Sequence, residues 1–152
     1  MAGNGVIGQG SATTLYGYSN VYYNIQRQGY IEGAIVMAGT NDYNFNVTAD
    51  NFRTSVNDAL TLLKTRTNKI LVITPLHRAN ESANSVGMTL SDYSNIIKEI
   101  CRSKSITYYD GFSISINPND TSLMPDGLHP NNAGHEIIYA NIRNIVSNTF
   151  SF

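Results

Sequence analysis

The five residues Asp126-Gly127-Leu128-His129-Pro130 have the types and spacing that hydrolytic chemistry requires. A carboxylate three residues before a histidine can bind one ring nitrogen and fix the tautomer of the imidazole, which leaves the other nitrogen to take a proton from a nucleophile. A structural role also fits, because Asp-Gly is a common turn dipeptide and Pro130 suits a first helical position, so that His129 would cap a helix. The motif alone leaves both interpretations open.

Length and composition limit the classes of protein to consider. A chain of 152 residues can form one domain with a full hydrophobic core, and we expect residues 1–152 to be that domain. Ten Lys and Arg against eleven Asp and Glu give a net charge of -1 without a basic run, which argues against a nucleic-acid partner. The single cysteine, Cys101, excludes an intrachain disulfide and follows an apolar helical pattern, where a buried thiol is expected.

Membrane and export signals are also missing from the sequence. No apolar stretch reaches the ~20 residues of a membrane span. Residues 1–4 have neither the basic start nor the hydrophobic segment of a signal peptide. We therefore expect a soluble chain without a membrane span, although an export signal could lie upstream.

The hydrophobic pattern alternates between strands and helices. Continuous apolar runs at 33–38 and 69–74 predict strands covered on both faces, and 106–109 predicts a short third strand. An amphipathic helix capped by Thr48 is predicted between the first two strands, with an apolar face of Phe52, Val56, Ala59, Leu60 and Leu63. A second helix is predicted after Ser91, with its apolar face made by Tyr93, Ile96, Ile97, Ile100 and Cys101. A last helix is predicted at about 130–147, with Ile138, Ile142 and Ile145 facing inward. The polar residues 78–89 predict a loop, and the alternation predicts an α/β fold with a central parallel sheet.

Two further segments carry candidate functional groups. Functional groups of open parallel sheets gather beyond the carboxyl ends of the strands. The first strand is followed by Gly39-Thr40-Asn41-Asp42, where the Asn41 amide can donate a hydrogen bond to an oxygen that becomes negative in a transition state, although a simple turn is the competing interpretation. Residues 5–11 are glycine-rich and precede an expected helix, so their backbone N–H groups could supply a second donor. Nucleotide binding is the weaker alternative, because the segment lacks the Lys-Ser/Thr of a P-loop and a preceding strand.

Together these segments resemble the motifs of the SGNH or GDSL-like hydrolases, a family of esterases and lipases with a flavodoxin-like three-layer α/β/α fold. The third motif of that family matches residues 39–42, which implies that Asn41 belongs to the oxyanion hole. The last motif matches residues 126–130, which implies that Asp126 is the triad acid and His129 the triad base.

The glycine loop of the family is similar to residues 4–10 of this chain. The resemblance implies that Gly8 is the backbone donor of the oxyanion hole, with Gly5 or Gly10 as other possible registers.

The first family motif, a Gly-Asp-Ser that carries the nucleophilic serine, has no counterpart in this sequence. The resemblance therefore implies a domain that is incomplete at its N-terminus, with its first strand missing and an apolar strand edge left open. Three explanations remain: the chain is part of a longer protein, a second chain supplies the missing strand and serine, or the protein is an inactive relative. Ser11 is the candidate nucleophile within the chain, although a serine at a helix entrance is ordinarily an N-cap.

The function that the resemblance implies is ester hydrolysis of the acylhydrolase or acetylesterase type, in which Asp126 and His129 activate a serine outside this chain. The expected substrate is a small-molecule or glycan ester or a lipid, and the tyrosine-rich polar loops favour a glycan. The mechanism that the resemblance implies requires no metal or organic cofactor. No histidine pair that includes His77 or His135 has convincing metal-ligand spacing. His77 itself follows a strand exit and is expected either in a solvated loop or in the substrate cleft. The alternative function is a catalytically inactive SGNH-like binding or structural module.

Overall fold

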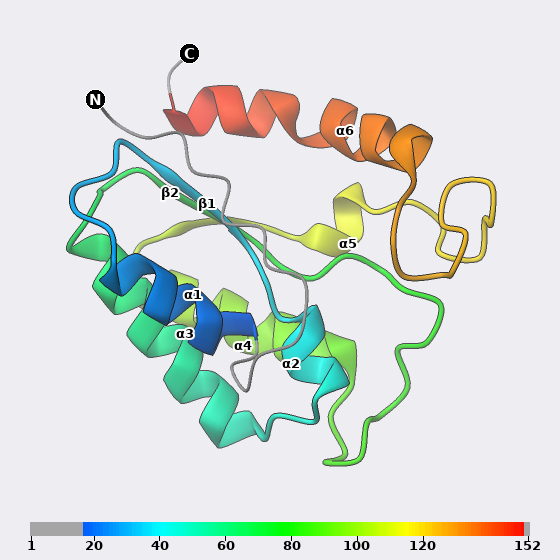
Figure 1. Ribbon diagram of the computed structural model, residues 1–152, viewed down its shortest axis with the longest axis horizontal. Helices are drawn as coiled ribbons and strands as arrows, with labels where there is room; N and C mark the ends of the chain where they lie inside the picture. The colour runs from blue at the N-terminus through cyan, green and yellow to red at the C-terminus, as the bar shows by residue number, and fades with distance from the viewer. Residues whose placement is uncertain (1–16, 151–152) are drawn as a thin grey trace.

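The computed structural model describes residues 17–150, which form a parallel sheet of three strands between two layers of helices (Figure 1). Strand β2 (Ile70–Ile73) is central, with β1 (Ala34–Met37) on one side and β3 (Thr107–Tyr109) on the other. In the register of the sheet, Val36 pairs with Val72, which in turn pairs with Tyr108. This is the predicted α/β architecture with a central parallel sheet.

The helices form two layers of unequal size. One face of the sheet is covered by α1 (Gly17–Gln26), α2 (Thr40–Asn44), α3 (Ala49–Lys64) and α4 (Leu90–Ser103) (Figure 1). The other face is covered by α5 (Gly111–Ile114) and α6 (Asn132–Phe150). Side chains of β2 alternate between these layers, so that Val72 faces α3 and α4 while Leu71 and Ile73 face α6.

Helices α3 and α4 confirm the periodicity of the sequence. Every apolar residue assigned to their inner faces is buried. Thr48 precedes α3 as predicted, but its side chain accepts no capping hydrogen bond. Helix α4 starts slightly earlier than predicted, because Thr89 and Asp92 form a reciprocal capping box at its N-terminus. Cys101 is fully buried in α4, as expected, and burial raises the pKa of its thiol to about 12.

Strand β1 departs from the prediction that both of its faces are covered. Val36 is buried against the helical layer, but Ile35 and Met37, on the opposite face, are 50% and 54% exposed. The reason is that α6 packs on β2 and leaves this face of β1 uncovered. Among the described residues, β1 pairs with β2 alone, so its second edge forms no ladder.

Helix α6 begins and ends slightly later than predicted. Ile138 is buried as expected, whereas Ile142 and Ile145 are half-buried against the α6 side of β2. None of the helices between residues 17 and 150 is long and apolar enough to cross a membrane.

Asp42, in α2, connects this short helix to the start of α1. Its side chain is 1% exposed, and the carboxylate accepts a hydrogen bond from the backbone N–H of Tyr18. The Oδ2 atom has no hydrogen-bond partner. Desolvation by burial raises the pKa of Asp42 to about 6, although the N–H of Tyr18 opposes this effect. The charged form of this carboxyl therefore destabilises the fold.

Replacing Asp42 by Asn should remove a pH-dependent loss of stability. The carboxyl has a pKa of about 6 in the folded chain and an ordinary value of 3.8, so the folded state binds more protons between these pH values and stability falls as pH rises through them. Burying the charge costs the wild type about 3 kcal/mol above this window relative to below it. Urea unfolding between pH 4 and pH 7 should show the variant gaining stability relative to the wild type by about that amount. Asp58→Asn, on the exposed face of α3, is the control for the loss of one charge. If the free energy of unfolding differed between wild type and Asp42→Asn by the same amount at every pH, the raised pKa of Asp42 would be contradicted.

Candidate active site

Asn41 lies in the first turn of α2, directly beyond the carboxyl end of β1. The chain turns at Gly39, which has a φ of 118° and so close an approach to β2 that an added Cβ would lie 2.9 Å from Pro75 Cγ. Only glycine fits this position without strain. The side chain of Asn41 is exposed and makes no hydrogen bond within the described residues, so its amide is available to a ligand. Residues 39–42 therefore do form a turn, and this turn starts α2 and exposes the Asn41 amide.

Asp126 and His129 form a hydrogen-bonded pair on the loop before α6. Nδ1 of His129 lies 2.6 Å from Oδ2 of Asp126, and the other carboxylate oxygen, Oδ1, accepts the backbone N–H groups of Leu128 and His129 at 2.9 and 2.7 Å. The bond from the His129 side chain, followed by these two backbone bonds, holds the pKa of Asp126 well below its usual range. An ionised Asp126 keeps the proton of a neutral imidazole on Nδ1, and Nε2 is then a free acceptor.

The helix-cap interpretation of His129 is wrong, because another residue caps α6. The side chain of Asn131 accepts a hydrogen bond from the backbone N–H of Gly134 at 3.0 Å, at the start of the helix. The turn interpretation of Asp126 is correct, but it does not exclude the pairing. One carboxylate oxygen closes the turn and the other binds the imidazole.

The loop between β2 and α4 joins the two motifs. The backbone N–H of Ala79 donates to the carbonyl of Gly127 at 2.8 Å, which attaches the loop to the Asp126–His129 turn. At its other side, the hydroxyl of Tyr43 in α2 donates to the carbonyl of Ser82 at 2.7 Å. No hydrogen bond joins Asn41 to His129 directly in residues 17–150, and this loop is bonded to both of their segments.

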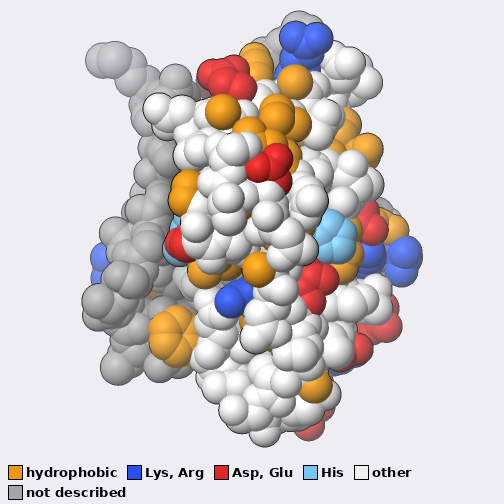
Figure 2. Space-filling model, turned by 90° about the vertical axis from the view of Figure 1, so that its right-hand side faces the viewer, with side chains coloured by type: hydrophobic (Ala, Val, Ile, Leu, Met, Phe, Trp, Pro, Cys, Tyr) orange, Lys and Arg blue, Asp and Glu red, His pale blue; other side chains and the backbone are white. Residues whose placement is uncertain are grey.

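The face that carries these loops is mainly uncharged. Figure 2 shows scattered acidic and basic groups among predominantly uncharged polar side chains and backbone. The side chains of His129 and Asp126 are 75% and 56% exposed, so water reaches the pair. In this surface, hydrogen bonds and not burial fix the orientation of the imidazole.

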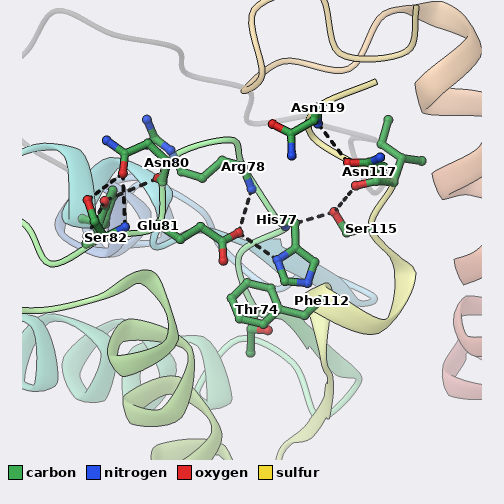
Figure 3. A network of polar contacts seen from close by, with 12 residues as sticks. Thr74, His77, Arg78, Asn80, Glu81, Ser82, Phe112, Ser115, Asn117 and Asn119 are labelled. Carbon is green, nitrogen blue, oxygen red and sulfur yellow. Dashed lines mark hydrogen bonds and ion pairs between the residues drawn. The ribbon is translucent and has the colours of Figure 1, made fainter. Parts of the chain in front are cut away.

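A second histidine–carboxylate pair lies on the loop between β2 and α4. Nδ1 of His77 is 2.8 Å from Oε1 of Glu81, and the imidazole stacks on Phe112 with ring centroids 4.1 Å apart (Figure 3). His77 is thus half-buried and held in place, not a freely solvated loop residue. Sequence reasoning missed Glu81 and Phe112. The His-to-Glu spacing of four residues was the available signal for the first, whereas Phe112 lies far away in sequence.

The remaining candidates are located as follows. Gly8 and Ser11 lie outside the described residues. His135 is exposed on α6. Within residues 17–150, no group of three or more His, Cys, Asp and Glu side chains is arranged to hold a metal ion.

The fold is similar to those of several solved structures. A protein from Lactobacillus plantarum aligns with a TM-score of 0.67 at 22% identity, over 84% of this chain and 72% of that one. A carbohydrate acetylesterase family member from Sinorhizobium meliloti aligns with a TM-score of 0.64 at 14% identity, over 89% and 69%. An inhibitor-bound aryl esterase of M. smegmatis aligns with a TM-score of 0.64 at 16% identity, over 87% and 67%. At these identities, the matches establish a shared fold.

The family follows from the sequence match. A search of curated protein sequences finds no significant match. The family model of the GDSL-like lipases and acylhydrolases matches residues 5–137, which include the glycine-rich segment, the Asn41 turn and the Asp126–His129 loop. The chain belongs to the GDSL-like lipase/acylhydrolase family.

Proposed function

We propose that this chain provides the acid–base pair and the oxyanion donors of a serine ester hydrolase. His129 takes the proton of the nucleophile through Nε2 and returns it to the leaving alcohol. Asp126 orients the imidazole and stabilises its charged form. The Asn41 side chain, with a backbone N–H of the glycine-rich segment assigned to Gly8, binds the oxyanion. Residues 1–152 act as one domain in this proposal.

The observation that carries the proposal is the bond of 2.6 Å between Nδ1 of His129 and Oδ2 of Asp126. A histidine that acts as a general base needs an unprotonated Nε2, and this bond provides it by holding the proton of the neutral imidazole on Nδ1. The turn that Asp126 closes fixes the carboxylate relative to the histidine backbone, so the pair is formed before any substrate arrives. The exposed Asn41 amide, which makes no hydrogen bond to another residue of 17–150, supports the same assignment.

We further propose that the nucleophilic serine lies outside this chain, in an upstream segment or in a second chain. The sequence contains no Gly-Asp-Ser to follow a first strand. The edge of β1 that has no partner strand among residues 17–150, together with the exposed Ile35 and Met37, suits a further strand, which would pair there and cover the apolar face. The substrate is an ester of a small molecule or a glycan, which is consistent with a related fold named as a carbohydrate acetylesterase family member.

Replacing His129 by Ala should reduce kcat for p-nitrophenyl acetate by about 10⁴-fold or more, because no other group would accept the serine proton. The protein to assay is the chain together with its Gly-Asp-Ser segment, as a fusion or as the native complex. His135→Ala removes another exposed histidine and should leave kcat unchanged. Because His129 is exposed, its loss should leave the fold intact, which circular dichroism can verify.

Labelling with a fluorophosphonate, followed by peptide mapping, locates the nucleophile in the same preparation. Label on a serine of the Gly-Asp-Ser segment supports the proposal. Label on Ser11 would show that the chain holds its own nucleophile. Absence of both label and hydrolysis would favour the alternative, a binding or structural module that has lost catalysis.

Asn41→Ala should lower kcat by roughly 10²–10³-fold while KM changes little, because an oxyanion donor acts mainly on the transition state. Steady-state kinetics on p-nitrophenyl acetate measure both constants. Asn95→Ala, on the exposed side of α4, is the matched control. A loss confined to KM would assign Asn41 to substrate binding instead of oxyanion stabilisation.

A further inference from the structure

A polar hollow of about 500 Å³ lies between α2 and the loop from β2 to α4. Its walls include Tyr43, Asn44, Asn46, Arg78, Asn80 and Ser82. Two of these residues connect it to the site. Asn44 is in the same short helix as Asn41, and Arg78 precedes Ala79, whose N–H binds the carbonyl of Gly127. The hollow is therefore formed by the two segments, α2 and the β2–α4 loop, that carry Asn41 and hold the Asp126–His129 turn.

Three amides in these walls have oxygen atoms that already accept hydrogen bonds. Oδ1 of Asn44 accepts from Nη1 of Arg78, Oδ1 of Asn46 accepts the N–H of Ser85 at 2.9 Å, and Oδ1 of Asn80 accepts the N–H of Ser82 at 3.1 Å. Each of these partners can only donate, so the oxygen of each amide must face it. The NH₂ groups of all three amides make no hydrogen bond within the described residues. The hollow thus has spare donors, while these acceptors are already in use.

Arg78 adds a positive charge without a counter-ion. Its guanidinium lies over the ring of Tyr43, 5.2 Å from the centroid, and makes no ion pair within the described residues. The nearby carboxylate of Glu81 instead accepts His77 Nδ1 and the backbone N–H of Arg78, as Figure 3 shows. Nε of Arg78 is buried and has no partner. The cation is held in place by an aromatic ring and an amide oxygen, which do not neutralise it.

We propose that this hollow binds an anionic group, a carboxylate or a phosphate, through Arg78 and the NH₂ groups of Asn44 and Asn80. The guanidinium N–H donors match the oxygen atoms of such anions. A hydrogen bond from an amide NH₂ to an ionised oxygen is also stronger than one to a neutral oxygen. In the ester hydrolase, the hollow holds an anionic substituent of the substrate, such as the carboxylate of a uronic acid or a phosphate ester. That role rests on the proposed function, whereas anion binding does not.

Titration of the chain with inorganic phosphate, D-glucuronate and D-glucose tests the proposal without an ester or a nucleophile. The readout is the NMR signals of the Asn44 and Asn80 side-chain amides and of the Arg78 Nε–H. The two anions should shift these signals, and the neutral sugar should not. Arg78→Gln should weaken anion binding by about tenfold or more, because it removes the charge. Arg102→Gln is the matched control, since Arg102 lies over the ring of Tyr108 at 5.3 Å, and it should bind as the wild type does.

Asn44→Asp is a second variant that tests anion binding if Arg78→Gln does not fold. It retains the contact with Arg78 but supplies a carboxylate, so the folded variant should lose anion binding. Shifts with both anions support the hollow as a substrate subsite, and shifts with phosphate alone support it as a phosphate site. Equal shifts with glucose, or anion binding that survives in both variants, would overturn the proposal. A hydrolysis assay that fails while anions bind would instead refute the proposed function.

Discussion

The parallel pairing of β1 with β2 is the constraint on which the arrangement of the site depends. The register places Met37 beside Ile73, so the two strands end level and their following segments emerge together. Gly39 then lies against Pro75 with no room for a side chain. Because β2 is buried on both faces, this pairing is anchored in the core and cannot shift without exposing apolar surface. The pairing of β1 with β2 therefore sets the relative positions of the Asn41 turn and the loop from β2 to α4.

Two carboxylates near the site show how different environments change the same group. Asp126 lies in water, and donors from His129 and the adjoining backbone hold its pKa low. Asp42 is enclosed between α1 and α2 with an unpartnered oxygen, and its pKa is raised. Hydrogen bonds dominate at the exposed position, whereas desolvation dominates at the buried one. The exposed aspartate can therefore keep its charge to orient a histidine, while the buried one connects two helices at a cost in stability above its pKa.

The hydrophobic periodicity of the sequence predicted α3, α4 and the central strand because burial on a regular element repeats at a fixed spacing. It failed for β1, where Ile35 and Met37 belong to an apolar run but have no layer over them. It also did not identify α2 and α5 as helices, since helices of four or five residues are too short to show a period. Both failures concern features that neighbouring elements control, and not the residues themselves.

The pairing of Asp126 with His129 was predictable because three residues of chain bring the two side chains within reach, and the Asn41 turn because glycine permits its backbone. The arrangement between these motifs was not. It depends on contacts such as Ala79 with Gly127, Tyr43 with Ser82 and His77 with Phe112, which join residues more than thirty positions apart. The same holds in the hollow for Asn44 and Asn46, whose amide oxygens accept from Arg78 and Ser85, donors more than thirty positions away. The sequence alone determines which side chains lie within reach along a few residues. The hydrogen-bond partners that are distant in sequence depend on how the helices and strands pack.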